Sequence, residues 1–351
     1  MKKLLLPLLF VAPLLLAQEK KIVVTGMTDA VVQELRAVSP NARIVSVLPA
    51  KPERFARMAP ASPRTDAERE QLYRELADAD GLVGAPRPDV IKAGKKLKWV
   101  QVANAGVEAY EYPELANSDI VVTNFQKVAS SAIADHAMGM LLALTRELTY
   151  YIANRPQETW GKPEIKARDL QGGTAVVIGV GGIGSNVAVR AWAAGMKVIG
   201  VDPRDISPTP FVQRTVYPDR LDSVLPEADV VFICAPDTPA SRGMMGPKQF
   251  GLMKQGSYFI AVSRGRLYAM DALVNALKSG KLAGAGVDVT NPEPLPKGHP
   301  LWKFENVVIT PHIATRSQDE LRRQIDVVKE NIARFVNGEP LKYVVDKKKG
   351  Y

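Results

Sequence analysis

One stretch of the sequence constrains the fold more than any other, TAVVIGVGGIGSNVAVRAWAAGMKVIGVDP at residues 174–203. An apolar run typical of a buried strand leads directly into a G-x-G-x-x-G motif, and a helical stretch follows at once. In that position the first glycine permits a tight turn, the second lets a pyrophosphate approach the backbone, and the third lets helix and strand pack closely. Free N–H groups at the helix N-terminus would bind the phosphates. The residues expected at this site are Gly179, Gly181, Gly182, Ile183 and Gly184.

The next apolar run, KVIGVDP, ends in an acidic residue that indicates which dinucleotide would bind. Asp202 stands where a carboxylate can accept hydrogen bonds from the adenosine ribose hydroxyls. This favours NAD, because a 2′-phosphate would meet a like charge. Arg204 follows two residues later and could bind a 2′-phosphate instead, so NADP remains an alternative.

Short apolar runs alternate with helical stretches on both sides of this motif. Before it come KIVVTG, RIVSVLP, GLVGA, KWVQVANAG and IVVTNF; after it come KVIGVDP, DVVFICAP, GSYFIAVSRG, AGAGVDV and NVVITPH. Short β-branched runs separated by helices predict parallel strands joined by right-handed crossovers. The sequence therefore predicts an α/β protein with two doubly wound parallel-sheet domains and a cleft between them. The second sheet is expected to hold six strands.

The spacing of apolar residues also predicts where the longer helices lie. Helices are expected over residues 29–38, 66–79, 130–148 and 317–335. Residues 150–165, by contrast, have turn chemistry and little periodicity, and the Pro- and Arg-rich residues 49–65 read as a surface loop.

Composition excludes several classes of protein. At 351 residues, with 46% hydrophobic and 24% charged residues, the chain is long enough for two folded domains and is not disordered. The single cysteine, Cys234, excludes an intrachain disulfide. The net charge of +9 comes mostly from dispersed basic residues, which indicates a solvated surface or a field that attracts small anions, so no nucleic-acid partner is expected. No metal site is expected either.

The chain begins MKKLLLPLLFVAPLLLAQEKK, which resembles an export signal over residues 1–19. Two lysines precede an apolar stretch, and a small residue, Ala17, precedes a polar one. The apolar stretch is too short to span a bilayer comfortably, so no stable membrane span is expected. We expect export to the periplasm or tethering by the leader; the alternatives are a wrongly assigned start codon and a cytoplasmic protein.

Three polar residues follow later strands of the second series. Arg264 lies in AVSRG, Glu293 in DVTNPEP and His312 in ITPHIA, and ligands collect at such strand ends in a doubly wound sheet. With the glycine motif, these strings resemble the D-isomer-specific 2-hydroxyacid dehydrogenases, over roughly residues 95–340. The resemblance implies that Arg264 binds the substrate carboxylate and polarises the keto oxygen. It further implies that His312 is the general acid or base, and that Glu293 holds and charges its imidazole.

The resemblance also implies further contacts with the cofactor and the substrate. Asp288 would meet the nicotinamide end of the cofactor, and the remaining cofactor residues would be Cys234, Ala235, Pro236, Val262 and Ala314. Cys234 itself reads as a small buried hydrophobe. In the first domain, the turn VANAGVEAYEY would bind the substrate carboxylate through the backbone amides of Asn104, Ala105, Gly106 and Val107. Two positions depart from the family pattern: Glu108 replaces an aspartate, and Thr290 a phenylalanine.

Two functional hypotheses follow. In the first, the protein is an NAD(P)-dependent oxidoreductase that interconverts a small 2-oxo acid, of the glyoxylate or hydroxypyruvate kind, and its D-2-hydroxy acid. In the second, it is an NAD(H)-binding sensor or scaffold of the same fold without turnover. The resemblance implies a homodimer, a flavodoxin-like substrate domain at residues 20–124 and 313–351, and a Rossmann NAD-binding domain at 125–312. His136 is expected to have a packing role and His299 to be solvated.

Overall fold

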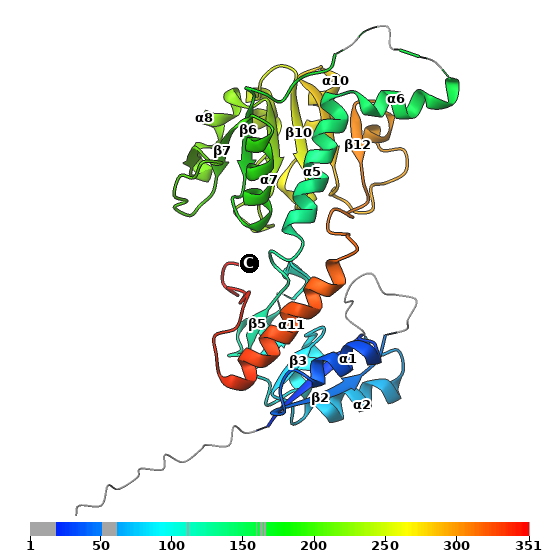
Figure 1. Ribbon diagram of the computed structural model, residues 1–351, viewed down its shortest axis with the longest axis vertical. Coiled ribbons are helices and arrows are strands. Elements are labelled where there is room, and N and C mark those ends of the chain that lie inside the picture. The colour runs from blue at the N-terminus through cyan, green and yellow to red at the C-terminus, as the bar shows by residue number, and fades with distance from the viewer. Residues whose placement is uncertain are drawn as a thin grey trace, which may run out of the picture.

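The structure is a computed structural model that describes residues 19–50, 62–110, 112–158, 160–161, 164 and 166–350. It contains two parallel sheets, one formed by the first part of the chain and the other by the central part (Figure 1). The predicted class, two doubly wound α/β domains, is confirmed. Apart from its last residue, the leader predicted over 1–19 lies outside the described residues, as does most of the loop predicted over 49–65.

The first sheet has five parallel strands in the order β2-β1-β3-β4-β5. The strands are β1 (Lys20–Thr25), β2 (Ala42–Val47), β3 (Gly81–Val83), β4 (Trp99–Gln101) and β5 (Val121–Thr123). The helices around them are α1 (Asp29–Arg36), α2 (Asp66–Leu76), α3 (Pro88–Ala93), α4 (Pro113–Ala116) and, from the far end of the chain, α11 (Glu320–Asn337). This order is that of flavodoxin-like sheets.

Alternate side chains of β1 contribute buried residues to the hydrophobic clusters on the two faces of the first sheet. Ile22 packs in the cluster that includes Ile332 of α11, whereas Val23 packs in the cluster that includes Leu76 of α2. Period-2 alternation puts consecutive residues on opposite faces, so each face needs its own helical cover. The C-terminal segment is held to the same sheet, because Lys347 Nζ donates to the carbonyls of Leu115 and Ile120 at 3.2 and 3.1 Å.

The second sheet has seven parallel strands in the order β12-β11-β10-β9-β6-β7-β8. They are β6 (Thr174–Ile178), β7 (Lys197–Val201), β8 (Arg214–Val216), β9 (Val230–Ile233), β10 (Ser257–Ala261), β11 (Leu282–Val287) and β12 (Val307–Ile309). From β8 to β11 this is the strand order of dinucleotide-binding sheets, and β12 extends it at one edge. The order reverses between β6 and β9, so the crevice at their carboxyl ends is where such sheets bind ligands.

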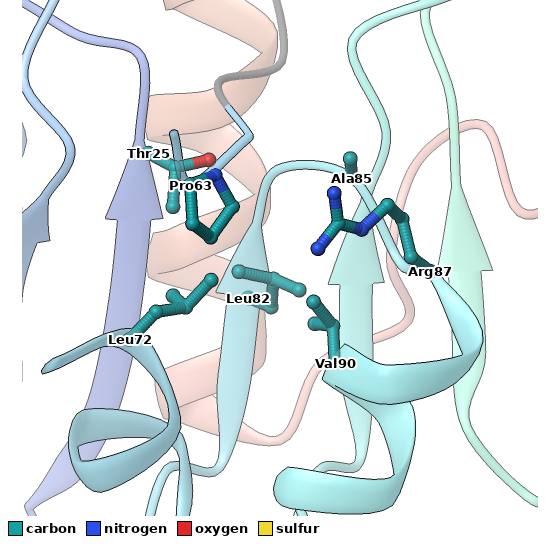
Figure 2. Close-up of a pocket in the computed structure, with 7 residues that line it drawn as sticks. All are labelled: Thr25, Pro63, Leu72, Leu82, Ala85, Arg87 and Val90. Carbon is teal, nitrogen blue, oxygen red and sulfur yellow. The ribbon is translucent and has the colours of Figure 1, made fainter. Parts of the chain in front are cut away.

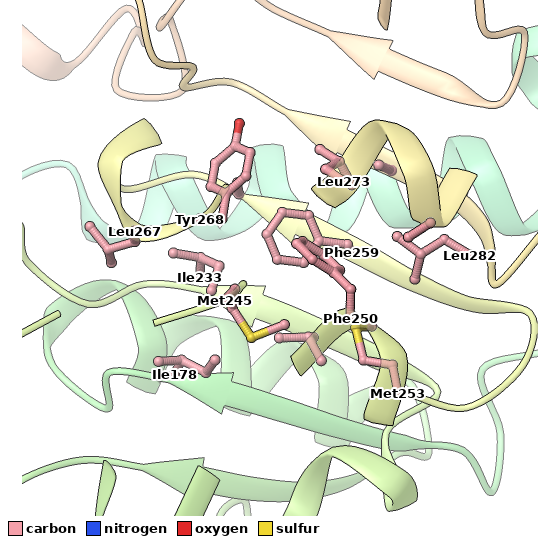
Figure 3. Close-up of a cluster of buried hydrophobic side chains, with 14 of the residues drawn as sticks. Ile178, Ile233, Met245, Phe250, Met253, Phe259, Leu267, Tyr268, Leu273 and Leu282 are labelled. Atoms are coloured by element: carbon pink, nitrogen blue, oxygen red, sulfur yellow. The ribbon is translucent and has the colours of Figure 1, made fainter. Parts of the chain in front are cut away.

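Helices cover both faces of the second sheet. They are α5 (Ser130–Thr145), α7 (Gly182–Ala193), α8 (Leu221–Val224), α9 (Pro247–Leu252) and α10 (Met270–Lys278), while α6 (Leu148–Asn154) buries no residue. On one face, Phe259 of β10 contacts Phe250 and Tyr268 edge to face, with ring centroids 5.0 and 5.2 Å apart (Figure 3). On the other face, α5 and α7 contribute Leu141 and Val187 to a second buried cluster.

Several expectations about the elements were wrong. The sheet has seven strands rather than six, because β8 is a short edge strand with no fully buried residue. Residues 148–154, expected to be part turn, form α6, which follows Glu147 in a left-handed conformation and buries no residue. Without a buried face, α6 leaves no apolar period in the sequence. The last helix begins three residues later than expected, at Glu320. The helices expected over 66–79 and 130–148 each end three residues earlier than expected, at Leu76 and Thr145. Within the described ranges, no helix is both long and apolar enough to cross a membrane.

Candidate active site

The glycine motif lies at the reversal point of the second sheet and has the geometry that a dinucleotide needs. A Cβ on Gly179 would lie 2.6 Å from the backbone nitrogen of Ala235, and Gly179 has a φ of +89°. A Cβ on Gly184 would lie 1.8 Å from the carbonyl oxygen of Gly179. Gly181, by contrast, has nothing within 4 Å of that position. Two glycines therefore serve close packing, while the third leaves the open approach that a pyrophosphate requires, so the loop fits NAD(P).

Asp202 holds the glycine loop in place from the end of β7. Its carboxylate accepts hydrogen bonds from Val180 N at 2.8 Å and from Arg204 N and Nε at 3.0 and 2.8 Å. Burial raises the pKa of Asp202, but these hydrogen bonds outweigh it, so the pKa lies below its ordinary value and the charge is kept. A cavity of about 190 Å³ adjoins Asp202 and Arg204. This is the side of the loop where the adenosine half of a dinucleotide is expected.

The other predicted cofactor residues are distributed around the same crevice. Cys234, Ala235 and Pro236 follow β9, Val262 follows β10, and Ala314 lies beyond β12. The side chain of Cys234 is buried, and burial raises the pKa of its thiol. It is therefore a small buried hydrophobe, as expected.

The structure brings together His312 and Glu293, the two residues predicted to act as an acid–base pair. His312 Nδ1 lies 2.9 Å from Glu293 Oε2, and the two side chains are 41% and 38% exposed. Glu293 is oriented in turn, because its Oε1 accepts a hydrogen bond from Thr290 N at 2.9 Å. Among the described residues His312 Nε2 has no hydrogen-bond partner, so the second ring nitrogen is available to a ligand. His312 also has a left-handed backbone, with a φ of 53°, which is uncommon for a residue other than glycine.

Asp288 fixes the backbone that carries His312. It is 2% exposed and accepts hydrogen bonds from Thr310 Oγ1 at 2.6 Å, from Ile313 N at 2.9 Å and from Ala314 N at 3.0 Å. His136 of α5 joins this network, with Nε2 2.9 Å from Thr310 Oγ1. Sequence reasoning placed Asp288 at the cofactor and did not identify these supporting contacts, since hydrogen bonds across 22 or more residues leave no local pattern. His299, expected to be solvated, accepts a hydrogen bond from Leu301 N through Nδ1.

Arg264 reaches across to the first sheet. Its Nε donates to Glu108 Oε1 at 2.5 Å, and its Nη1 donates to the carbonyl of Ser263 at 2.8 Å. A Cβ on Gly106 would lie 2.0 Å from Arg264 Nη2, so the guanidinium rests against the turn predicted to bind substrate. Burial raises the pKa of Glu108, but attraction and hydrogen bonding to Arg264 outweigh burial and lower it. Among the described residues, no hydrogen bond joins Arg264 to Glu293 or His312.

Side-chain hydrogen bonds stabilise the predicted substrate turn. Asn124 Nδ2 donates to the carbonyl of Ala105 at 2.6 Å, and Asn104 Nδ2 donates to Tyr110 Oη at 3.2 Å. Val107 is buried in the core of the first sheet. The Glu108–Arg264 ion pair was not predicted, although Glu108 was identified from the sequence as a departure from the family pattern. The residues are 156 positions apart, and only the fold brings them together.

Two cavities lie near the predicted substrate turn or at the end of the first sheet, and neither is lined by Arg264, Glu293 or His312. The one at the carboxyl ends of β1 and β3, lined by Thr25, Leu82 and Arg87 among others, measures about 10 Å³ and holds one water at most (Figure 2). A larger cavity of about 440 Å³ lies where Val107 and Tyr110 of the substrate turn face Asp237 in the loop after β9. The second is large enough for a small ligand and is lined by residues from both halves of the protein.

The fold and this arrangement define an α/β protein with two parallel sheets, the second of which has the strand order and glycine loop of a dinucleotide-binding sheet. The sequence model of the D-isomer specific 2-hydroxyacid dehydrogenase, NAD binding domain matches residues 138–314. The chain is 31% identical to the glyoxylate reductase of Thermofilum pendens over 80% of this chain and 85% of that protein. It therefore belongs to the D-isomer specific 2-hydroxyacid dehydrogenase family.

Other relatives place the protein within a broad family. It is 32% identical to the D-3-phosphoglycerate dehydrogenase of Methanocaldococcus jannaschii, over 80% of this chain and 54% of that protein, and so spans about half the length of such relatives. It also resembles a solved structure, the NADPH-dependent glyoxylate/hydroxypyruvate reductase of Sinorhizobium meliloti in complex with NADP and sulfate. That match has a TM-score of 0.75 and 26% identity, and it covers 95% of this chain and 100% of the reductase. An NAD(P) cofactor follows from the family.

Proposed function

We propose that this protein reduces a small 2-oxo acid to its D-2-hydroxy acid, and catalyses the reverse oxidation, with His312, Glu293 and Arg264 at the reacting centre. The observation that carries the proposal is the 2.9 Å contact of His312 Nδ1 with Glu293, at the same sheet edge that positions Arg264. These residues follow β12, β11 and β10, which are neighbours in the sheet.

In this mechanism the chain supplies charge and one proton. When bound, NAD(P)H supplies the hydride that adds to the keto carbon. His312 Nε2 gives its proton to the keto oxygen, and Glu293 stabilises the imidazolium before that transfer. Arg264 binds the substrate carboxylate through Nη2, the guanidinium nitrogen that lies against Gly106, while Glu108 holds Nε.

The substrate class we propose is that of glyoxylate and hydroxypyruvate. Two similar proteins, from Thermofilum pendens and Sinorhizobium meliloti, are named as reductases of these acids. The phosphoglycerate dehydrogenases match at similar identity over half their length. We further propose that NAD is preferred over NADP, because Asp202 keeps its negative charge where the adenosine ribose is expected.

A substrate panel tests the proposal. Oxidation of NADH and of NADPH is followed with glyoxylate, hydroxypyruvate and a 3-phosphorylated 2-oxo acid, for wild type, His312→Ala and Arg264→Lys. We expect turnover of the unphosphorylated acids, and a loss of about 100-fold or more in kcat without His312. NADH binding without turnover of any 2-oxo acid would overturn the proposal and favour the sensor or scaffold function.

Two further proposals concern assembly and location. The homodimer is supported by exposed apolar side chains on α5 and α6, where Leu142, Leu148 and Ile152 are 42%, 45% and 69% exposed. Light scattering of wild type against Ile152→Asp tests it, and a monomeric wild type would contradict it. Export is supported by the composition of residues 1–19; N-terminal sequencing of the natural protein tests it, and an intact Met1 in a cytoplasmic fraction would contradict it.

A further inference from the structure

The segment that joins the two sheets lies directly over the start of the dinucleotide-binding helix. β5 ends at Thr123 and α5 begins at Ser130, and the residues between them run past the N-terminus of α7. A Cβ on Gly182, the first residue of α7, would lie 2.5 Å from Ser130 Oγ and 2.8 Å from Lys127 Cγ. The side chain of Lys127 therefore fills the space that a side chain at residue 182 would otherwise take.

This arrangement leaves the glycine loop without a cation of its own. The loop GVGGIGS, residues 179–185, contains no lysine or arginine, and position 182 has no room for one. Two arginines lie near, but each has an acidic partner: Arg190 Nε bonds Asp135 at 2.7 Å, and Arg204 Nε bonds Asp202 at 2.8 Å. Neither is placed to give its full charge to a phosphate at the loop.

Lys127, in contrast, is an exposed cation whose ammonium has no ion pair or hydrogen bond within the described part of the chain. Its backbone has a φ of +70°, in the left-handed region that lysine seldom adopts. Lys127 is therefore a cation beside the open phosphate site whose charge no described residue neutralises.

We propose that Lys127 binds the pyrophosphate of NAD(P), on the side opposite the N–H groups of α7. A lysine ammonium binds phosphate as a compact point charge, and the helix N-terminus supplies hydrogen-bond donors to the same group. Because Lys127 belongs to the segment between the sheets, the cofactor would also hold that segment against the second sheet. The inference rests on NAD(P) binding alone and does not depend on the substrate or on the acid–base pair.

Equilibrium binding to the full chain tests the role of Lys127 without turnover. NADH, ADP and adenosine are titrated against wild type, Lys127→Ala, Lys127→Gly and Lys127→Arg, with Lys95→Ala as control because Lys95 is also an exposed lysine, on the other domain. We expect the Kd values of NADH and ADP to rise by roughly three- to thirtyfold in Lys127→Ala and Lys127→Gly, the range for loss of a partly exposed charged contact with phosphate. Adenosine, which lacks phosphate, should bind all variants equally.

Salt dependence and thermal stability separate this role from a structural one. Loss of one charged contact should make the dependence of the NADH Kd on salt shallower, while Lys127→Arg and Lys95→Ala should keep the wild-type dependence. Lys127→Gly should melt no lower than wild type, since glycine tolerates the left-handed backbone. The proposal would be overturned if Lys127→Ala and Lys127→Gly kept the wild-type affinity for NADH and its salt dependence. It would also be overturned if these variants bound ADP and adenosine more weakly by the same factor.

Discussion

Substitution of Gly106 by alanine should abolish most activity while leaving the fold intact. The added Cβ would lie 2.0 Å from Arg264 Nη2 and 2.3 Å from Glu108 Oε2, far inside van der Waals contact. Both atoms are ends of flexible side chains rather than backbone, so the clash is relieved when the guanidinium moves by about 1 Å, at little cost in stability. A displacement of that size at a substrate-positioning group reduces rate by about 100-fold.

The assay for Gly106→Ala combines three measurements on one preparation. We expect kcat/KM for glyoxylate to fall by about 100-fold, the NADH Kd to stay at its wild-type value, and the melting temperature to change by less than about 3 °C. Unchanged kcat/KM would refute the reasoning, because it would mean that the position of Arg264 against the turn does not matter to the reaction. A collapse in melting temperature would refute the claim that only side-chain ends must move.

Three other changes test the rest of the site. Gly184→Ala should lower stability and NADH affinity together, because its Cβ would lie 1.8 Å from the carbonyl oxygen of Gly179; thermal melts and NADH titration check this, and intact affinity would contradict it. Glu293→Gln should lower kcat by about 100-fold with NADH binding unchanged, because the imidazolium of His312 loses its counter-charge; steady-state kinetics and NADH titration check this. The depressed pKa of Glu108 adds stability above its unfolded pKa that is lost as pH falls through the folded value. The unfolding free energies of wild type and Glu108→Gln should therefore differ by up to about 1 kcal/mol at pH 7 and converge in acid.

Local patterns in the sequence predicted most of the strands and helices of the fold. Apolar runs gave the buried strands of both sheets, and the glycine spacing marked the turn between β6 and α7, since backbone geometry at that turn admits few residue types. Elements without a buried face were missed. Both α6 and the edge strand β8 lack fully buried residues, so neither shows the period that identifies an amphipathic element.

The residues of the candidate site also fall into two groups, those that the sequence identifies and those that only the fold brings together. Arg264, Glu293 and His312 could be found because each lies within six residues of the end of a recognisable strand, in strings that resemble the family's motifs. The residues that position them could not, because they act over long separations in sequence: Glu108 on Arg264 over 156 residues, and His136 on Thr310 over 174. Only the crossover topology brings these pairs into contact.

Arg264 joins the two halves of the candidate site. The glycine loop, Glu293 and His312 all belong to the second sheet, so their mutual positions persist however the two halves move. Arg264 belongs to that sheet too, yet its Nε is bonded to Glu108 and its Nη2 lies against Gly106, both in the turn after β4. Any movement of one sheet relative to the other therefore alters the hydrogen bonding and direction of the guanidinium before it alters the His312–Glu293 contact. Domain closure should therefore change substrate affinity first, through Arg264, and the rate of proton transfer only afterwards.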